Sequence, residues 1–256
     1  MTAFAKIGFA SLATVLFGCG PDNGTGTPHL PDLVMAASST DGPQSFPDAS
    51  GPPATGHVVY LNFGGQGITA GAADDPVNNV SLTATHDGTI RAWQQGFADQ
   101  KMSEDDITSS LIGVLAPYNI RIVTTRPATP GYDMIVFGGF ASAIVDGVAD
   151  DTTFSIAPND CSTTSPNVGF IFDVAWLDAI DIADNAVAMI GLVNDIPATV
   201  DNGDCMCFSG STCDFIAKPC TFGKNAQITT AHPQCENAAG RFDEAARFLM
   251  TFGAHP

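Results

Sequence analysis

Residues 57–65 read HVVYLNFGG, and this segment predicts the first strand of the fold. It is rich in the β-branched and aromatic residues that favour strands, and its two closing glycines end the run. Apolar runs of the same kind follow over residues 120–125, 134–137 and 168–172. We therefore expect a mixed β-sheet of about four or five strands.

Segments with a helical pattern lie between and after these runs. Their apolar residues recur at spacings of three and four, which places them on one face of a helix. The predicted helices cover residues 87–97, 103–116, 182–193 and 242–252. Ser103 and Asp106 form a helix-start pair, and Asp243 and Glu244 suit the positive end of the last helix dipole. A mixed sheet with three or four packed helices defines an α+β fold.

The N-terminus has the features of an export signal. Residues 7–18 are an apolar stretch that is too short to span a bilayer but suits the hydrophobic region of a secretory signal. The sequence LFGC at residues 16–19 resembles the lipobox of bacterial lipoproteins. We expect a signal peptide over residues 1–18, lipidation of Cys19 and a membrane anchor through that lipid. The alternative is an ordinary signal peptide that happens to contain a cysteine.

Residues 19–55 predict a disordered tether behind the lipidated cysteine. The stretch holds seven prolines mixed with Gly, Ser, Thr and Asp, so it cannot bury enough apolar surface to offset its ordering entropy. Residues 56–256 are enough for one globular domain with a sizeable core. We expect this single domain to be lipid-anchored in the cell envelope of a bacterium, or secreted.

The chain is strongly acidic. It has 27 acidic and 9 basic residues and a net charge of −18. Such a surface repels phosphate backbones, so we expect no nucleic-acid partner. The charge leaves cation binding open, although a solvated acidic exterior needs no ligand.

Six cysteines lie beyond the tether, and an even number in an exported chain favours disulfide bonds. They are Cys161, Cys205, Cys207, Cys213, Cys220 and Cys235. Five of them crowd into residues 205–235, so we expect cross-links that staple a long C-terminal loop region. The alternative is a zinc site of four thiolates between residues 205 and 220. The pairing stays open, because six cysteines allow 15 connectivities.

The order of these phrases resembles a known family. HVVYLNFGG, YNIRIVTTRP, YDMIVFGG, NVGFIFD and DCMCF succeed one another as in the zincin domains of secreted metzincin-like, especially matrixin-like, bacterial zinc metallopeptidases. The resemblance covers residues 57–252 and implies a zincin-like domain. In that family a helix carries HExxHxxGxxH, and a later turn contains a methionine beneath the metal. The histidines bind zinc, the glutamate activates water, and the glycine turns the chain.

This motif is absent from the chain. No histidine occurs between His86 and His232, and the stretch that matches the motif, AVAMIGLVNDIPATVD at residues 186–201, contains neither His nor Glu. Catalysis of the family type needs both residue types. The sequence therefore predicts no catalytic residue. Met206 in DCMCF would occupy the place of the family's methionine, where it packs and does not bind metal.

A register can still be assigned to the missing ligands. If Gly191 takes the first ligand position, Asp195 falls at the second and Asp201 at the third, while Leu192 replaces the general base. Asp195, Asp201 and His232 are then the candidates for a rebuilt metal centre. We predict no cofactor on this basis, and zinc and calcium are the metals that the acidic side chains leave open.

Three hypotheses follow for the function. The first is an exported pseudoenzyme, a degenerate metallopeptidase-like domain that binds a protein or peptide and is catalytically inactive. The second is an active zinc metallopeptidase with non-standard metal ligands. The third is a disulfide-rich surface or adhesion module unrelated to zincins, in which the helix over residues 182–193 would not lie against the sheet.

Overall fold

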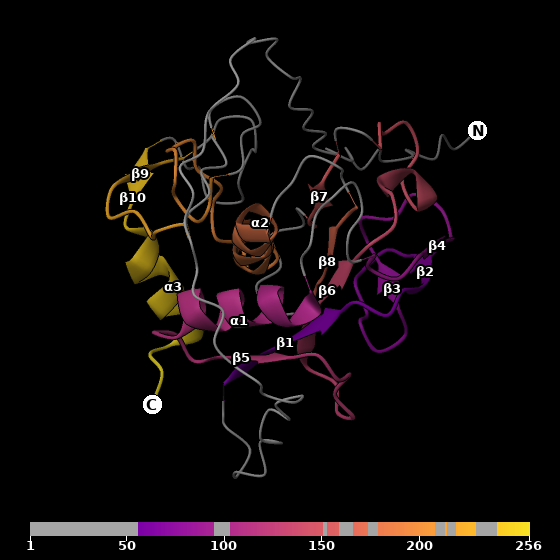
Figure 1. Cartoon of the computed structure of the whole chain (residues 1–256), viewed down its shortest axis with the longest axis horizontal. Coiled ribbons are helices and arrows are strands. Elements are labelled where there is room, and N and C mark those ends of the chain that lie inside the picture. Colours follow the sequence, from indigo (N-terminus) through magenta and orange to yellow (C-terminus); the bar gives the residue numbers. More distant parts are fainter. Residues whose placement is uncertain are drawn as a thin grey trace, which may run out of the picture.

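The structure is a computed structural model with an α+β fold (Figure 1). It describes residues 56–94, 103–150, 153–158, 166–173, 179–207, 213, 219–228 and 240–256. The predicted signal peptide, lipidation site and tether lie outside these ranges. So do Cys161, His232 and Cys235.

The main sheet has five strands in the order β5-β1-β6-β8-β7. The strands are β1 (His57–Asn62), β5 (Ile120–Val123), β6 (Tyr132–Phe137), β7 (Ser155–Ile156) and β8 (Val168–Ile171). The first four in the sheet order are parallel, and β7 runs antiparallel at the edge. Every residue of β6 and β8 is buried, as expected for inner strands that are covered on both faces. The four predicted strands are confirmed as β1, β5, β6 and β8. Strand β7 was not predicted.

Three helices are described: α1 (Glu104–Leu115), α2 (Ala179–Leu192) and α3 (Glu244–Phe252). Ser103 caps α1 by accepting from the backbone N–H of Asp106, whose side chain returns the bond, so the predicted capping box is present. Helix α1 packs against β5, α2 packs against β6 and β8, and the two helices contact each other (Figure 1). Between residues 182 and 190 only Asp184 is not fully buried, so α2 is a core helix.

A small second sheet, β3-β2-β4, lies beside the main one (Figure 1). Its strands are β2 (Gln66–Ala70), β3 (Val80–Ser81) and β4 (Gly88–Ile90). The predicted helix over residues 87–97 is therefore wrong in its described part, since β4 pairs antiparallel with β2. Glycine and threonine open this segment and are poor helix formers. The helical spacing of Ile90 and Trp93 instead reflects separate contacts with the core.

The described part of residues 199–242 contains little regular secondary structure and is cross-linked by disulfides. Strands β9 (Ala226–Gln227) and β10 (Arg241–Phe242) form a two-stranded ladder. Disulfides join Cys205 to Cys220 and Cys207 to Cys213. The alternative of a four-thiolate zinc site is excluded, because these sulfurs bond to each other. No helix in the described part of the chain is long and apolar enough to cross a membrane.

Gly88 offers a test of strand β4. A Cβ at this position would collide with the carbonyl oxygen of Ala143, which is backbone and cannot swing away. We expect Gly88→Ala to lower the free energy of unfolding by about 1–3 kcal/mol, as overpacking does.

Gly67 on the paired strand β2 is the control, because the atom nearest to its Cβ would be 4.0 Å away. Gly67→Ala should change the unfolding free energy by less than about 0.5 kcal/mol. Equal losses in urea denaturation of the two variants would contradict the placement of β4.

Candidate functional site

The C-terminal end of α2 and the loops around it form the candidate site. The helix ends in a Schellman motif: the N–H of Ile196 donates to the carbonyl of Gly191, and the N–H of Asp195 donates to that of Leu192. Asp195 has a φ of 58°, the left-handed conformation that usually selects glycine. The chain therefore turns sharply at Asp195.

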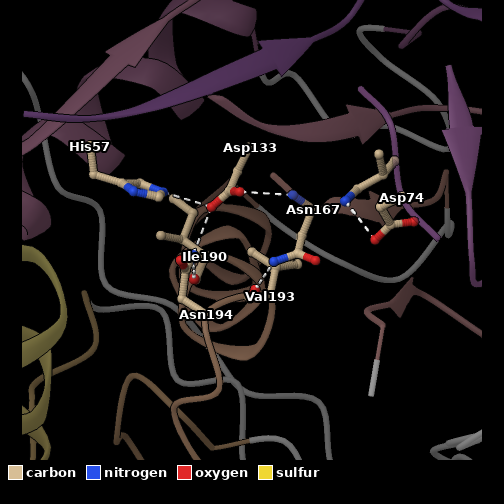
Figure 2. A network of polar contacts seen from close by, with 8 residues as sticks. His57, Asp74, Asp133, Asn167, Ile190, Val193 and Asn194 are labelled. Carbon is tan, nitrogen blue, oxygen red and sulfur yellow. Dashed lines mark hydrogen bonds and ion pairs between the residues drawn. The ribbon is translucent and has the colours of Figure 1, made fainter. Parts of the chain in front are cut away.

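A buried carboxylate holds this helix end against the sheet (Figure 2). Asp133 on β6 has a side chain that is only 1% exposed. Its Oδ2 accepts from Asn194 Nδ2 at 2.7 Å and lies 2.7 Å from His57 Nε2, and its Oδ1 accepts from the backbone N–H of Asn167 at 2.9 Å. One side chain thus joins the starts of β1, β6 and β8 to the end of α2.

Two asparagines complete the network by capping helix carbonyls. Asn194 Nδ2 donates its second proton to the carbonyl of Ile190 at 2.9 Å, and Asn167 Nδ2 donates to the carbonyl of Val193. The last carbonyls of a helix have no partner within the helix, and in the core they need one from elsewhere. The side chains in Figure 2 supply these partners.

Met206 packs directly on α2. Its side chain is fully buried, and its Sδ and Cε occupy the space beside Gly191 that a Cβ would enter. The backbone N–H of Thr199 donates to the carbonyl of Met206 at 2.7 Å, and the flanking cysteines form the two disulfides. Met206 is therefore a packing residue in the structure.

Two acidic side chains, Asp204 and Glu244, accept hydrogen bonds from Met206 and its neighbouring segments. Glu244 at the start of α3 is fully buried, and burial together with the hydrogen bond and charge of Asp204 raises its pKa to about 10. Asp204 Oδ1 accepts from Thr199 Oγ1 and from the N–H of Met206, both at 3.0 Å, and Glu244 Oε2 accepts from the N–H of Gly223 at 2.7 Å. Glu244 therefore keeps its proton at neutral pH.

Glu244 corrects one sequence-based interpretation. We expected it to act with Asp243 on the helix dipole. Asp243 does cap α3, accepting from the N–H of Ala246 at 2.9 Å. Glu244 is uncharged at neutral pH, so it contributes no charge to the dipole.

The structure describes two of the three candidate metal ligands, Asp195 and Asp201. Asp201 Oδ2 accepts from the N–H of Gln227 at 2.6 Å and lies 3.8 Å from Arg241 Nη1, so it faces the β9–β10 ladder. Asp195 lies at the helix-ending turn, and His232 lies outside the described residues. Within the described ranges, no group of three or more His, Cys, Asp or Glu side chains could hold a metal ion.

Sequence reasoning missed the network around Asp133. A single aspartate inside the otherwise apolar YDMIVF strand was the available signal, because a charge in a fully buried strand needs partners. The partners come from residues up to 76 positions away, and nothing in the sequence pairs them.

Comparison with family models, with curated proteins and with solved structures finds no match for this chain.

Asn194 tests the importance of the buried network. Asn194→Ala removes one donor from Asp133 and leaves the Ile190 carbonyl without its side-chain donor. We expect a loss of about 1–3 kcal/mol in unfolding free energy, measured by urea denaturation. Asn78→Ala is the matched control, since Asn78 is exposed and bonds only to nearby Asp75. A loss no larger than that of the control would refute a supporting role.

The raised pKa of Glu244 predicts that the folded protein is more stable at acidic pH than at alkaline pH. In the unfolded chain Glu244 ionises near its ordinary pKa of 4.5, but in the folded chain it keeps its proton up to about pH 10. Its stabilising contribution is complete below the unfolded pKa and is lost as pH rises towards the folded pKa. The melting temperature should therefore fall between about pH 5 and about pH 9.

Glu244→Gln should flatten that fall, because glutamine does not titrate. Glu104→Gln, at an exposed acid in the first turn of α1, is the control and should keep the wild-type slope. Identical slopes in all three proteins would show that Glu244 is ionised in the folded chain.

Proposed function

We propose that this protein is an exported, lipid-anchored component of the bacterial cell envelope whose zincin-like domain binds a protein or peptide without cleaving it. The turn at Asp195 carries this proposal. In the family motif the chain-turning glycine lies three residues before the third ligand and seven after the first. Asp195 has a φ of 58°, the left-handed conformation that glycine adopts most readily, so it suits the place of a chain-turning glycine.

This alignment assigns new residues to the ligand positions. With Asp195 at the glycine, the three ligand positions fall on Ala188, Leu192 and Ala198, and the general base falls on Met189. Ala188 and Ala198 are buried and offer only methyl groups. None of these side chains can bind zinc or activate water.

The first sequence-based register fares no better as a metal site. An imidazole at position 191 would need the space that Met206 Sδ and Cε fill. Asp201 is already bonded to the β9–β10 ladder. Zinc therefore does not fit the residues present in either register, and no catalytic step is assigned to this domain.

Two further features support a zincin-like scaffold. Helix α2 packs against the main sheet, as the resemblance requires. Met206 packs against α2 from the loop that follows, as expected of a methionine in the position that the resemblance gives it. A cross-linked domain that keeps this framework and lacks a metal site is suited to binding, and the predicted anchor at Cys19 would hold it at a membrane.

The proposal predicts the metal content of the protein. The protein should be produced in an oxidising compartment and dialysed without chelator. Circular dichroism should then show a folded domain, and mass spectrometry should find no stoichiometric zinc. A denatured protein substrate should not be cleaved in a chelator-sensitive manner. Stoichiometric zinc in the wild-type protein would overturn the proposal in favour of an active enzyme with unusual ligands.

The register predicts where a zinc site can be rebuilt. The triple variant Ala188→His, Leu192→His, Ala198→His should gain zinc and a zinc-dependent rise in melting temperature. The matched triple Gly191→His, Asp195→His, Asp201→His should gain neither, because Met206 blocks position 191. The reverse result would reject the register. A folded first triple that stays free of zinc would reject the zincin-like scaffold.

A further inference from the structure

A groove between α1 and α2 is separate from the residues discussed so far. It has a volume of about 370 Å³, within the range of sites for small ligands or single peptide side chains. The described part of its lining is mainly apolar and includes Ser110, Gly113, Val114, Ala183, Asp184 and Pro219. Helices α1 and α2 lie side by side here and form two walls of the groove (Figure 1).

Gly113 is the unusual residue in this wall. A glycine inside a helix costs roughly 0.5–1 kcal/mol relative to alanine. Among the described residues no contact requires it, since a Cβ at this position would meet nothing within 4 Å. Glycine also allows another molecule to approach the backbone closely. The bare backbone at Gly113 therefore fits a groove that receives a ligand.

The charge of the two helices that form the groove indicates the kind of ligand. Helices α1 and α2 contain Glu104, Asp105, Asp106, Asp181 and Asp184 and no lysine or arginine. Asp184 lines the groove, and its Oδ1 accepts from the N–H of Cys220 at 3.1 Å, which fixes its position. An apolar floor beside a fixed carboxylate, on a chain of net charge −18, complements a cation attached to an apolar group.

We propose that the α1–α2 groove binds a cationic amphipathic peptide segment, with an apolar side chain in the groove and a lysine or arginine near Asp184. This deepens the proposed binding role by naming its site and the chemistry of its partner. The inference rests on that role only in its expectation of a peptide ligand. It does not depend on the zincin-like register, because none of the ligand positions lines the groove.

The test uses purified full-length protein and a short fluorescent peptide that carries leucine on one helical face and lysine on the other. The wild-type protein should bind this peptide by fluorescence anisotropy, and more weakly as salt is added. A peptide with glutamate in place of lysine should not bind. Equal binding of both peptides, or no binding of the lysine peptide, would overturn the proposed ligand class.

Gly113→Leu separates the groove from the rest of the surface. The leucine side chain would fill the groove and should weaken binding by about tenfold or more, equivalent to about 1.4 kcal/mol. The same change should keep or raise the melting temperature, because leucine is the better helix former. Ser109→Leu, on an exposed position of α1 outside the groove, is the matched control and should bind like the wild type.

Asp184→Asn tests the charge, since its amide oxygen can still accept from Cys220. It should weaken binding several-fold and reduce the salt dependence. Unchanged affinity in Gly113→Leu would overturn the groove while leaving a binding function elsewhere on the domain intact. Zinc in the wild-type protein would overturn the proposed function without affecting these peptide measurements, so the two failures are distinguishable.

Discussion

The fold depends on bringing the buried C-terminal end of α2 against the starts of the parallel strands. Helix α2 is apolar along most of its length, so water cannot satisfy its last carbonyls or the strand starts that face it. The Asp133 carboxylate meets this constraint by accepting from three segments at once. A buried carboxylate is costly unless it is paired and hydrogen-bonded. Here the partners are amide groups and a half-buried histidine, and their amides also cap the helix.

The elements were predictable where one local signal agreed with the tertiary environment. Strands β1 and β6 are rich in apolar residues and end at glycine pairs, and Ser103 with Asp106 marks the start of α1. Residues 87–94 failed this condition. Their apolar residues repeat with a helical period, but pairing with β2 decides their conformation. Two-residue strands such as β7 and β9 carry too little pattern to be recognised.

The site was less predictable, because its energetics come from long-range contacts. Glu244 has the sequence position of a dipole-stabilising acid, yet the fold buries it against Asp204 and neutralises it. Asp195 and Asp201 are of a residue type that binds metals. In the fold, Asp195 is the left-handed residue that ends α2, and Asp201 accepts a hydrogen bond from Gln227 of the β9–β10 ladder. The sequence shows which side chains carry oxygen ligands. Only the fold determines the groups that those oxygens contact.

In the proposed register, a metal would tie α2 to the turn that follows it, and other interactions join the same elements in this chain. Met206 packs on Gly191, and the Thr199 N–H donates to the Met206 carbonyl. The buried Glu244 of α3 accepts from the N–H of Gly223 and donates its own N–H to the Gly223 carbonyl. The disulfide from Cys205 to Cys220 closes the loop covalently. Apolar packing, hydrogen bonds and a disulfide thus join this loop directly to its neighbours, so its attachment to α2 does not depend on a metal ion.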